Sequence, residues 1–198
     1  MENQSLNVIY GEKKIILSAP HSVLHKRNGS IRPRETRTGH IVNNLSRKCK
    51  IYGIYKKKAE LNDANWDRKC NYKKYLQELI KKEKIKALID VHGMAKWREQ
   101  DICIGINDGK NIQGNYKVLN NIIKIFNSYG FNNVTIDNPF GAGYKYCVSN
   151  YISRKCKIPC FQIEINLKYR SEKYKEYKDY NKLLEAFEKV IQILDEEL

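Results

Sequence analysis

The sequence lacks the patterns that would direct it out of a cell or into a membrane. Its first ten residues, MENQSLNVIY, contain no basic segment followed by an apolar one, which is the pattern of a secretory signal peptide. No apolar run approaches about 18 residues, the length that a helix needs to span a bilayer. We therefore expect a cytoplasmic protein that does not span a membrane, in which the six cysteines are reduced thiols rather than disulfides.

Cysteine pairs with the CxxC spacing are also missing, which argues against a structural zinc ribbon. Cys156 and Cys160 are four residues apart, but Pro159 lies between them at the start of an expected strand, so buried apolar thiols are the simpler interpretation. Internal repeats and linker-like segments are absent as well. The sequence thus predicts a single domain over residues 1–198.

Acidic residues are scarce relative to basic ones. The 198 residues include 37 Lys and Arg against 22 Asp and Glu, for a formal charge of +15 that is spread along the chain. A basic surface attracts anions of many kinds, from metabolite carboxylates to phosphate backbones. The charge is compatible with a small anionic substrate, with nucleic acid, or with a lysine-rich composition that has no function of its own.

Short apolar runs alternate with longer segments of helical period, which predicts an α/β domain with a largely parallel sheet. The expected strands cover residues 14–19, 51–55, 86–93, 101–106, 133–137 and 158–165. The expected helices cover residues 38–49, 71–85, 115–130, 144–156 and 180–198. Three loop-like stretches, 22–37, 56–70 and 137–143, are candidates to line a cleft.

Two of the four histidines stand at or near the ends of expected strands, where ligands bind in open α/β sheets. His21 follows IILSAP, and His92 follows ALIDV. Each alone could be a packed or turn histidine, but together they suggest a metal site, because imidazole is the commonest metal ligand. His25, four residues further along a basic loop, is expected at the rim or on the surface.

A hydrolytic zinc site needs three protein ligands and one open position, so the third ligand is sought among the acids. Glu35 is the best candidate by position, since it closes the loop that His21 opens. It could equally be a carboxylate at a helix entry that interacts with Arg34, Arg37 or the helix dipole. Asp90 is placed to hold the ring of His92, or to serve only its own loop.

Glu164 lies inside the expected strand CFQIEIN. Alternation places Gln162, Glu164 and Asn166 on one face and the apolar residues on the other. If helices cover both faces of the sheet, burying a carboxylate there is unfavourable in free energy unless it is paired with another group or has a function. Glu164 is therefore a candidate general base; the alternative is an edge strand with a polar face in solvent.

Candidate substrate contacts come from the segments between strands. Arg98 and Arg68 could bind a carboxylate in bidentate fashion, although most arginines in so basic a chain are simply solvated. Asn65 belongs to the same NDANWDR segment as Arg68 and is predicted to bind substrate with it.

The motifs SAPHS, RETRTG, NDANWD, LIDVHG, REQDICIG and FQIEIN, in this order over about residues 15–170, resemble the N-formylglutamate amidohydrolase family. The resemblance implies a three-layer, phosphorylase/hydrolase-like α/β fold with a mixed, largely parallel sheet, related to the zinc carboxypeptidases. It also implies one zinc ion held by His21, Glu35 and His92, with Glu164 as general base and Arg98 as a substrate contact.

The sequence departs from the family at PHSV, where many members have glycine after the serine. It has Glu35 where aspartate is often seen, and it is shorter than typical members. We expect a zinc-dependent hydrolase of an amide bond in a carboxylate-bearing substrate, such as an N-acyl amino acid or a glutamyl peptide. The alternatives are a deacylase acting on aminoacylated RNA and a non-catalytic nucleic-acid-binding domain.

Overall fold

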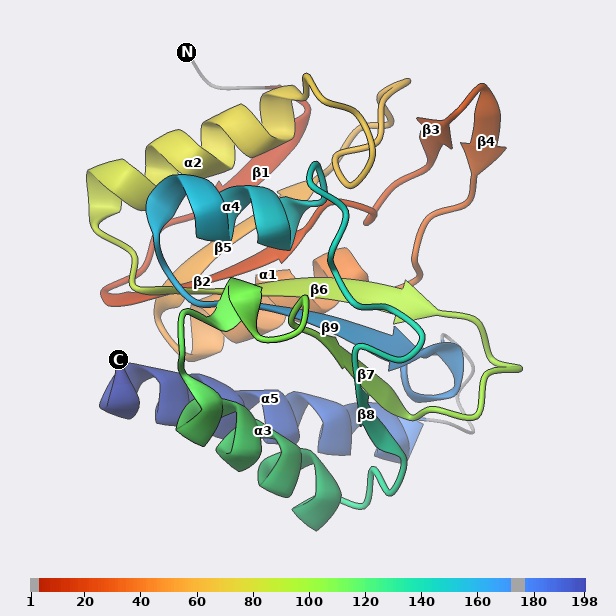
Figure 1. The fold of residues 1–198 in the computed structure, drawn as a ribbon. Coiled ribbons are helices and arrows are strands. Elements are labelled where there is room, and N and C mark those ends of the chain that lie inside the picture. The colour runs from red at the N-terminus through yellow and green to blue at the C-terminus, as the bar shows by residue number, and fades with distance from the viewer. Residues whose placement is uncertain (1–3, 172–176) are drawn as a thin grey trace.

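A computed structural model describes residues 4–171 and 177–198 (Figure 1). Its strands are, in chain order, β1 (Leu6–Ile9), β2 (Lys13–Ala19), β3 (His25–Arg27), β4 (Ser30–Arg32), β5 (Ile51–Lys56), β6 (Ala87–Met94), β7 (Ile102–Gly105), β8 (Val134–Ile136) and β9 (Cys160–Asn166). Its α-helices are α1 (Thr38–Lys48), α2 (Asn71–Glu83), α3 (Tyr116–Ser128), α4 (Val148–Cys156) and α5 (Tyr177–Glu197). Short 3₁₀ turns cover Lys110–Ile112 and Leu167–Tyr169.

Seven of the strands form one sheet, in the order β1-β5-β2-β6-β9-β7-β8. The four strands β5, β2, β6 and β9 are parallel to one another, whereas β1 at one end and the pair β7 and β8 at the other run in the opposite direction. The carboxyl ends of β2, β6 and β9 therefore lie side by side near the middle of the sheet. Ligand sites in α/β folds lie at such ends.

Helices cover both faces of the sheet: α2 and α4 pack on one face, and α1, α3 and α5 on the other (Figure 1). Each interface has its own apolar cluster, because the central strands present buried side chains on both sides. The helical period of the sequence accounts for the inner faces of the helices: Tyr72, Leu76 and Ile80, which are four residues apart on α2, are all buried. This architecture confirms the predicted three-layer α/β fold with a mixed, largely parallel sheet.

The differences from the sequence-based prediction lie in short elements. Strand β1, which has only four residues, was not predicted, and neither was the hairpin of β3 and β4 inside the expected loop 22–37. Strands β1, β3 and β4 are short and only partly buried, and β4 is exposed throughout, so no apolar run marks them in the sequence. Helix α4 begins at Val148 rather than at residue 144, so residues 144–147 belong to the preceding loop.

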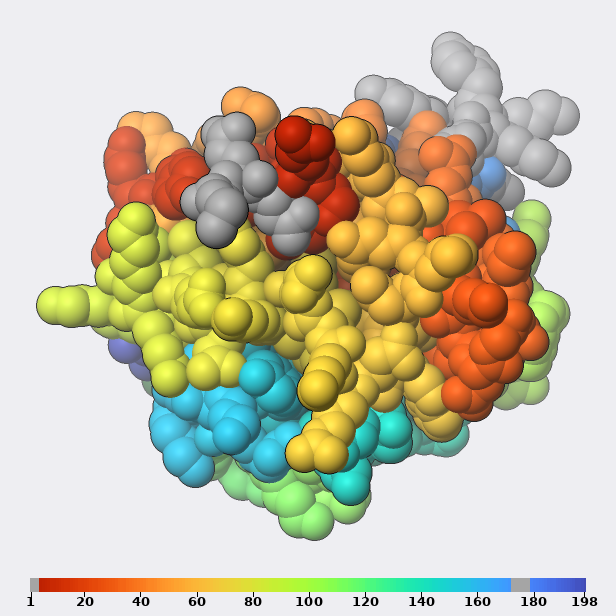
Figure 2. Space-filling view, turned by 90° about the horizontal axis from the view of Figure 1, so that it is seen from above, coloured from red at the N-terminus to blue at the C-terminus, as the bar shows by residue number. Residues whose placement is uncertain are grey.

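The hairpin lies against the segment 56–70, which connects β5 to α2. A parallel bridge joins His25 to Glu60, and Figure 2 shows the orange hairpin beside the yellow-orange segment. Both loops were expected to line a cleft, and this contact brings them to the end of the sheet where β2 and β6 finish. Within residues 4–171 and 177–198, no helix is long and apolar enough to cross a membrane.

Arg170 ties together the chain segments at this end of the sheet. Its buried guanidinium donates hydrogen bonds to three backbone carbonyls: Ile165 of β9 (2.9 Å), Met94 of β6 (2.9 Å) and Thr36 (2.8 Å), the residue after Glu35. Gly93 is required beside it, because a Cβ there would lie 2.1 Å from the guanidinium carbon. Arg170 thus fixes the position of the Glu35 segment relative to the central strands.

Replacing Arg170 with methionine should lower the free energy of unfolding by about 3 kcal/mol, because three buried carbonyls lose their donor and methionine supplies none. Urea denaturation of the wild type and of Arg170→Met measures the difference. Lys155→Met is the matched control: Lys155 lies on an exposed face of α4, and its replacement should change stability by less than about 0.5 kcal/mol. A loss similar to that of the control would show that Arg170 does not anchor this region.

Candidate active site

His21, Glu35 and His92 meet where β2 and β6 end. His21 follows β2 by two residues, His92 lies near the end of β6, and the backbone N–H of Glu35 donates to the His21 carbonyl at 2.9 Å. The Nδ1 atoms of both imidazoles face the same carboxylate: that of His21 is 2.8 Å from Glu35 Oε1, and that of His92 is 3.1 Å from Oε2. The three residues that the sequence predicted as ligands therefore converge on one point.

The opposite nitrogen of each ring is held by a buried aspartate. His21 Nε2 lies 2.8 Å from Asp63 Oδ1, and His92 Nε2 lies 3.1 Å from Asp90 Oδ2. Asp90 also accepts a hydrogen bond from Ser18, which fixes its carboxylate. Carboxylates in this position set the tautomer and the direction of metal-binding histidines. The role expected for Asp90 is thus geometrically possible, and Asp63 is its counterpart for His21.

The electrostatics of the cluster favour positive charge at its centre. Burial opposes protonation of His21 and His92, but the surrounding carboxylates outweigh it, so the pKa of each ring is raised above its ordinary value. Burial likewise opposes the charge of Glu35, yet the two imidazoles hold the pKa of its carboxyl well below the usual range. Three acidic side chains around two histidines make a site with an excess of negative charge, which suits a cation.

The donor set fits a metal ion. The ligand atoms of His21, Glu35 and His92 lie within 4.8 Å of one another, and nitrogen and oxygen donors of these types are those that zinc takes in hydrolytic sites. A second group, His21, His25 and Asp63, is equally compact. A metal ion in this second group would take His21 Nε2, the nitrogen that already contacts Asp63. A metal ion held by His21, Glu35 and His92 would take Nδ1 and leave the contact between His21 and Asp63 in place.

Glu164 stands opposite His92 in the β6–β9 ladder. Strand β9 lies between β6 and β7, so it is not the edge strand that the sequence left as an alternative. Glu164 is buried, and this burial is the main reason why the pKa of its carboxyl is raised to about 7. Gln162, on the same face of the strand, donates a hydrogen bond from Nε2 to Glu164 Oε1 at 3.0 Å.

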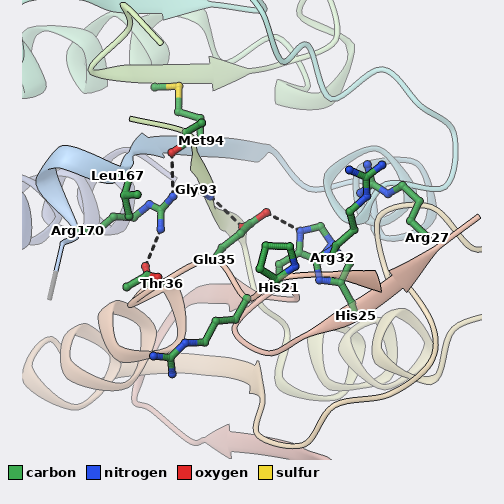
Figure 3. A pocket seen from close by; sticks show the side chains of 13 residues that line it. His21, His25, Arg27, Arg32, Glu35, Thr36, Gly93, Met94, Leu167 and Arg170 are labelled. Carbon is green, nitrogen blue, oxygen red and sulfur yellow. Dashed lines mark hydrogen bonds and ion pairs between the residues drawn. The ribbon is translucent and has the colours of Figure 1, made fainter. Parts of the chain in front are cut away.

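His25 is the one candidate whose environment was misjudged. It was expected at the rim or on the surface, but it is only 4% exposed and stacks on His21 with the ring centroids 3.9 Å apart. The unpredicted strand β3 carries it inward, and Figure 3 labels both histidines among the residues that line the pocket. Burial, together with the charge of His21, lowers the pKa of His25 to about 4.

Two adjoining cavities border the cluster, and His21, Arg27, Glu35 and Gly93 line both. The first, of about 480 Å³, runs along the hairpin and is lined by further arginines, some of which Figure 3 shows. The second, of about 370 Å³, reaches Glu164. Cavities of this size take small molecules.

The second cavity has an aromatic wall. Trp66 stacks on Tyr144 with the ring centroids 4.7 Å apart, and the guanidinium carbon of Arg27 lies over the Trp66 ring, 5.5 Å from its centroid. Arg27 is also paired with Asp63 through a 2.6 Å hydrogen bond, and its side chain is one-third exposed. A guanidinium thus lies beside the cluster, fixed by a buried carboxylate and still open to a ligand.

The three predicted substrate contacts occupy different places. Asn65 lines the second cavity: its Oδ1 accepts from the backbone of Val148 and its Nδ2 lies 2.9 Å from His92 Nε2. The guanidinium carbon of Arg98 lies 4.8 Å from the ring centroid of Phe140, and Phe140 lines the same cavity. Arg68 is exposed and is not among the described residues that line either cavity.

Sequence reasoning missed Asp63, Arg27 and Arg170. Asp63 belongs to NDANWD, a segment already noted for its loop character, and a search for an acid to hold His21 would have found it there. Arg27 and Arg170 carry no comparable signal, because each is one of many basic residues in loops and only the fold brings it to the site.

The sequence matches no protein-family model and no curated protein. Solved structures with the same fold include an N-formylglutamate amidohydrolase from Ralstonia eutropha JMP134, with a TM-score of 0.67 and 11% identity over 98% of this chain and 99% of that one. A bacteriophage poly-gamma-glutamate hydrolase has a TM-score of 0.58 and 14% sequence identity, over 97% of this chain and 90% of that one. A succinylglutamate desuccinalase from Vibrio parahaemolyticus has a TM-score of 0.53 and 12% sequence identity, over 98% of this chain and 72% of that one. At these identities the likeness establishes the shared fold.

Proposed function

We propose that the protein is a zinc-dependent hydrolase that cleaves an amide bond in a carboxylate-bearing substrate, such as an N-formyl or N-acyl amino acid or a glutamyl peptide. The observation that carries the proposal is the convergence of two histidine Nδ1 atoms on Glu35, with Glu164 buried across the ladder from His92. The solved structures of the same fold support the substrate class, since three of them are named for activities on glutamate derivatives.

In this proposal His21, Glu35 and His92 hold one zinc ion. Zinc bound there would supply Lewis-acid polarisation of the substrate carbonyl and a nucleophile at neutral pH. Asp63 and Asp90 keep the two rings directed at the ion by accepting hydrogen bonds from the opposite nitrogens. The cluster is thereby fixed before substrate binds.

Glu164 is the proposed general base. It accepts a proton from the attacking water and delivers that proton to the leaving nitrogen, so that the amine departs neutral. A carboxyl whose pKa is about 7 is suited to both steps near neutral pH, because it is a base in one step and an acid in the next. Burial on a central strand keeps the side chain in one position.

Arg27 is the proposed anchor for the substrate carboxylate, because it lines both cavities and one-third of its side chain is accessible. Arg98 is also proposed to contact the substrate, because it lies beside Phe140 of the second cavity. Asn65 is proposed to do so because it lines that cavity itself. Arg68 would need to move to reach a ligand in either cavity.

A deacylase of aminoacylated RNA is the second candidate, and one observation favours it: Arg27, Arg32 and Arg34 line the cavity along the hairpin. An RNA substrate would neutralise several cationic groups at once, so its affinity would fall steeply as salt is raised. A small carboxylate would show a much weaker dependence, which separates the two candidates.

The proposal is tested by assaying the zinc-loaded protein with N-formyl-L-glutamate and with the matched diamide, in which both carboxylates are neutral. The carboxylate substrate should have a kcat/KM at least about 10-fold higher, since a charge-assisted hydrogen bond contributes about 1.5–3 kcal/mol. Arg27→Met should reduce that preference. Equal turnover of both compounds would contradict the carboxylate assignment, and turnover of aminoacyl-RNA alone would support the second candidate.

A further inference from the structure

Gln162 presents a buried hydrogen-bond acceptor that the described residues leave unpaired. The side chain is 5% exposed and lines the same cavity as Glu164. Its Nε2 donates to Glu164 Oε1 at 3.0 Å, but its Oε1 is buried and has no hydrogen-bond partner in residues 4–171 and 177–198. A buried acceptor without a donor is unfavourable, so native structures seldom leave one unpaired.

The orientation of the carboxamide follows from its neighbour. Turning the amide over would place Oε1 against the carboxylate of Glu164, which brings two acceptors together and loses a hydrogen bond. Nε2 therefore faces Glu164, and Oε1 is the end that remains for another group. This assignment holds for as long as Glu164 is ionised.

The strands on either side of β9 supply no side-chain donor to Oε1 in the described residues. Gln162 pairs with Asp90 on β6 and with Gly105 on β7. Asp90 is itself an acceptor for Ser18, and Gly105 has no side chain, because a Cβ there would lie 2.6 Å from the Phe140 carbonyl oxygen. The nearby thiol of Cys147 donates to the Ala142 carbonyl instead. While Glu164 is ionised, no side chain among the described residues donates to Oε1, and the donor is then water in the free protein or a ligand bound in the cavity.

We propose that Gln162 Oε1 accepts a hydrogen bond from the N–H of the substrate's scissile amide, which makes Gln162 a specificity-determining residue. This inference rests on the proposed function and extends it to the substrate class: amides that carry an N–H, in preference to esters and N-alkylated amides. Both ends of the Gln162 carboxamide then act on the scissile nitrogen of the substrate. Nε2 positions Glu164, which protonates that nitrogen, and Oε1 accepts a hydrogen bond from its N–H.

The same contact explains why the carboxamide is built into β9 rather than into a loop. Strand β9 lies between β6 and β7 in the sheet, so the positions of Gln162 and Glu164 are set by a central strand and not by a loop. After cleavage the departing amine still carries N–H groups, so the hydrogen bond persists until the product leaves. An ester would place a lone pair against Oε1 and meet repulsion instead.

The test uses the zinc-loaded full chain and its Gln162→Met variant, with N-formyl-L-glutamate and its N-methyl derivative, in which a methyl group replaces the hydrogen of the scissile amide. Both substrates release an amine that needs a proton from Glu164, so loss of the hydrogen bond that positions Glu164 slows both and cancels in their ratio. The ratio of kcat/KM for the N–H amide over the N-methyl amide should fall about 10-fold or more in Gln162→Met relative to the wild type. Equal losses on both compounds would overturn the inference and leave Gln162 as a positioning residue only.

Binding provides a second measurement that needs neither turnover nor a folded variant. The wild type should bind N-formyl-L-glutamate at least about 10-fold more tightly than its N-methyl derivative, as measured by calorimetry at low temperature. Equal affinities would overturn the inference. Absence of hydrolysis with a preserved preference for the N–H compound would contradict the proposed function and leave the role of Gln162 standing.

Discussion

His92→Ala protein is expected to lose zinc during purification, with an affinity for the ion at least about 100-fold below that of the wild type. Loss of a group that only orients a ligand already costs 10–100-fold, and His92 is itself a proposed ligand. His21→Ala should behave in the same way, because its Nδ1 faces the same carboxylate at 2.8 Å. Metal analysis and competition with a chromophoric chelator measure both.

Two other histidines serve as matched controls. His40 is exposed at the start of α1, and His40→Ala should keep the zinc affinity of the wild type. His25 belongs to the second compact group, with His21 and Asp63, so His25→Ala separates the two possible sites. Retention of zinc by His25→Ala supports the site at Glu35. A loss as large as that of His92→Ala would place the ion beside Asp63 instead.

Glu164→Gln should retain zinc and lose about 10²–10⁴-fold in kcat, the range that general acid–base groups contribute. The substitution keeps the size of the side chain and removes only its ability to take and return a proton. Zinc content and a steady-state assay with N-formyl-L-glutamate measure the two parts of the prediction. An unchanged Kd for zinc is essential, because it separates a lost base from a lost metal site.

Glu99→Gln is the control for that experiment. Glu99 is exposed in the loop between β6 and β7, so the same chemical change there should leave kcat within about twofold. Full activity in Glu164→Gln would show that another group accepts the proton. Loss of zinc from the same variant would mean that Glu164 is needed for the metal rather than for proton transfer.

The sequence was most informative where periodicity and strand ends decide the structure. His21 and His92 could be paired in advance because the carboxyl ends of neighbouring parallel strands meet, and β2 and β6 are indeed neighbours. Glu164 could be placed on the polar face of its strand by alternation alone, and that strand is central. Apolar residues of helical period likewise identified the inner face of α2.

What the sequence could not supply depends on loops and on long-range order. The burial of His25 follows from a hairpin of two three-residue strands that contain mostly polar residues, so no apolar run marks it in the sequence. Arg27 and Arg170 gain their positions from contacts with Asp63 and with three carbonyls that lie far apart in the chain. The reversed direction of β7 and β8 has no local signature, because strand direction is set by the connections between elements.

X-ray diffraction from zinc-loaded crystals, recorded on both sides of the zinc absorption edge, tests the central claim most directly. The account predicts one anomalous peak per chain, within bonding distance of His21 Nδ1, His92 Nδ1 and the Glu35 carboxylate. A peak between His25 and Asp63, or no peak at this end of the sheet, would contradict it.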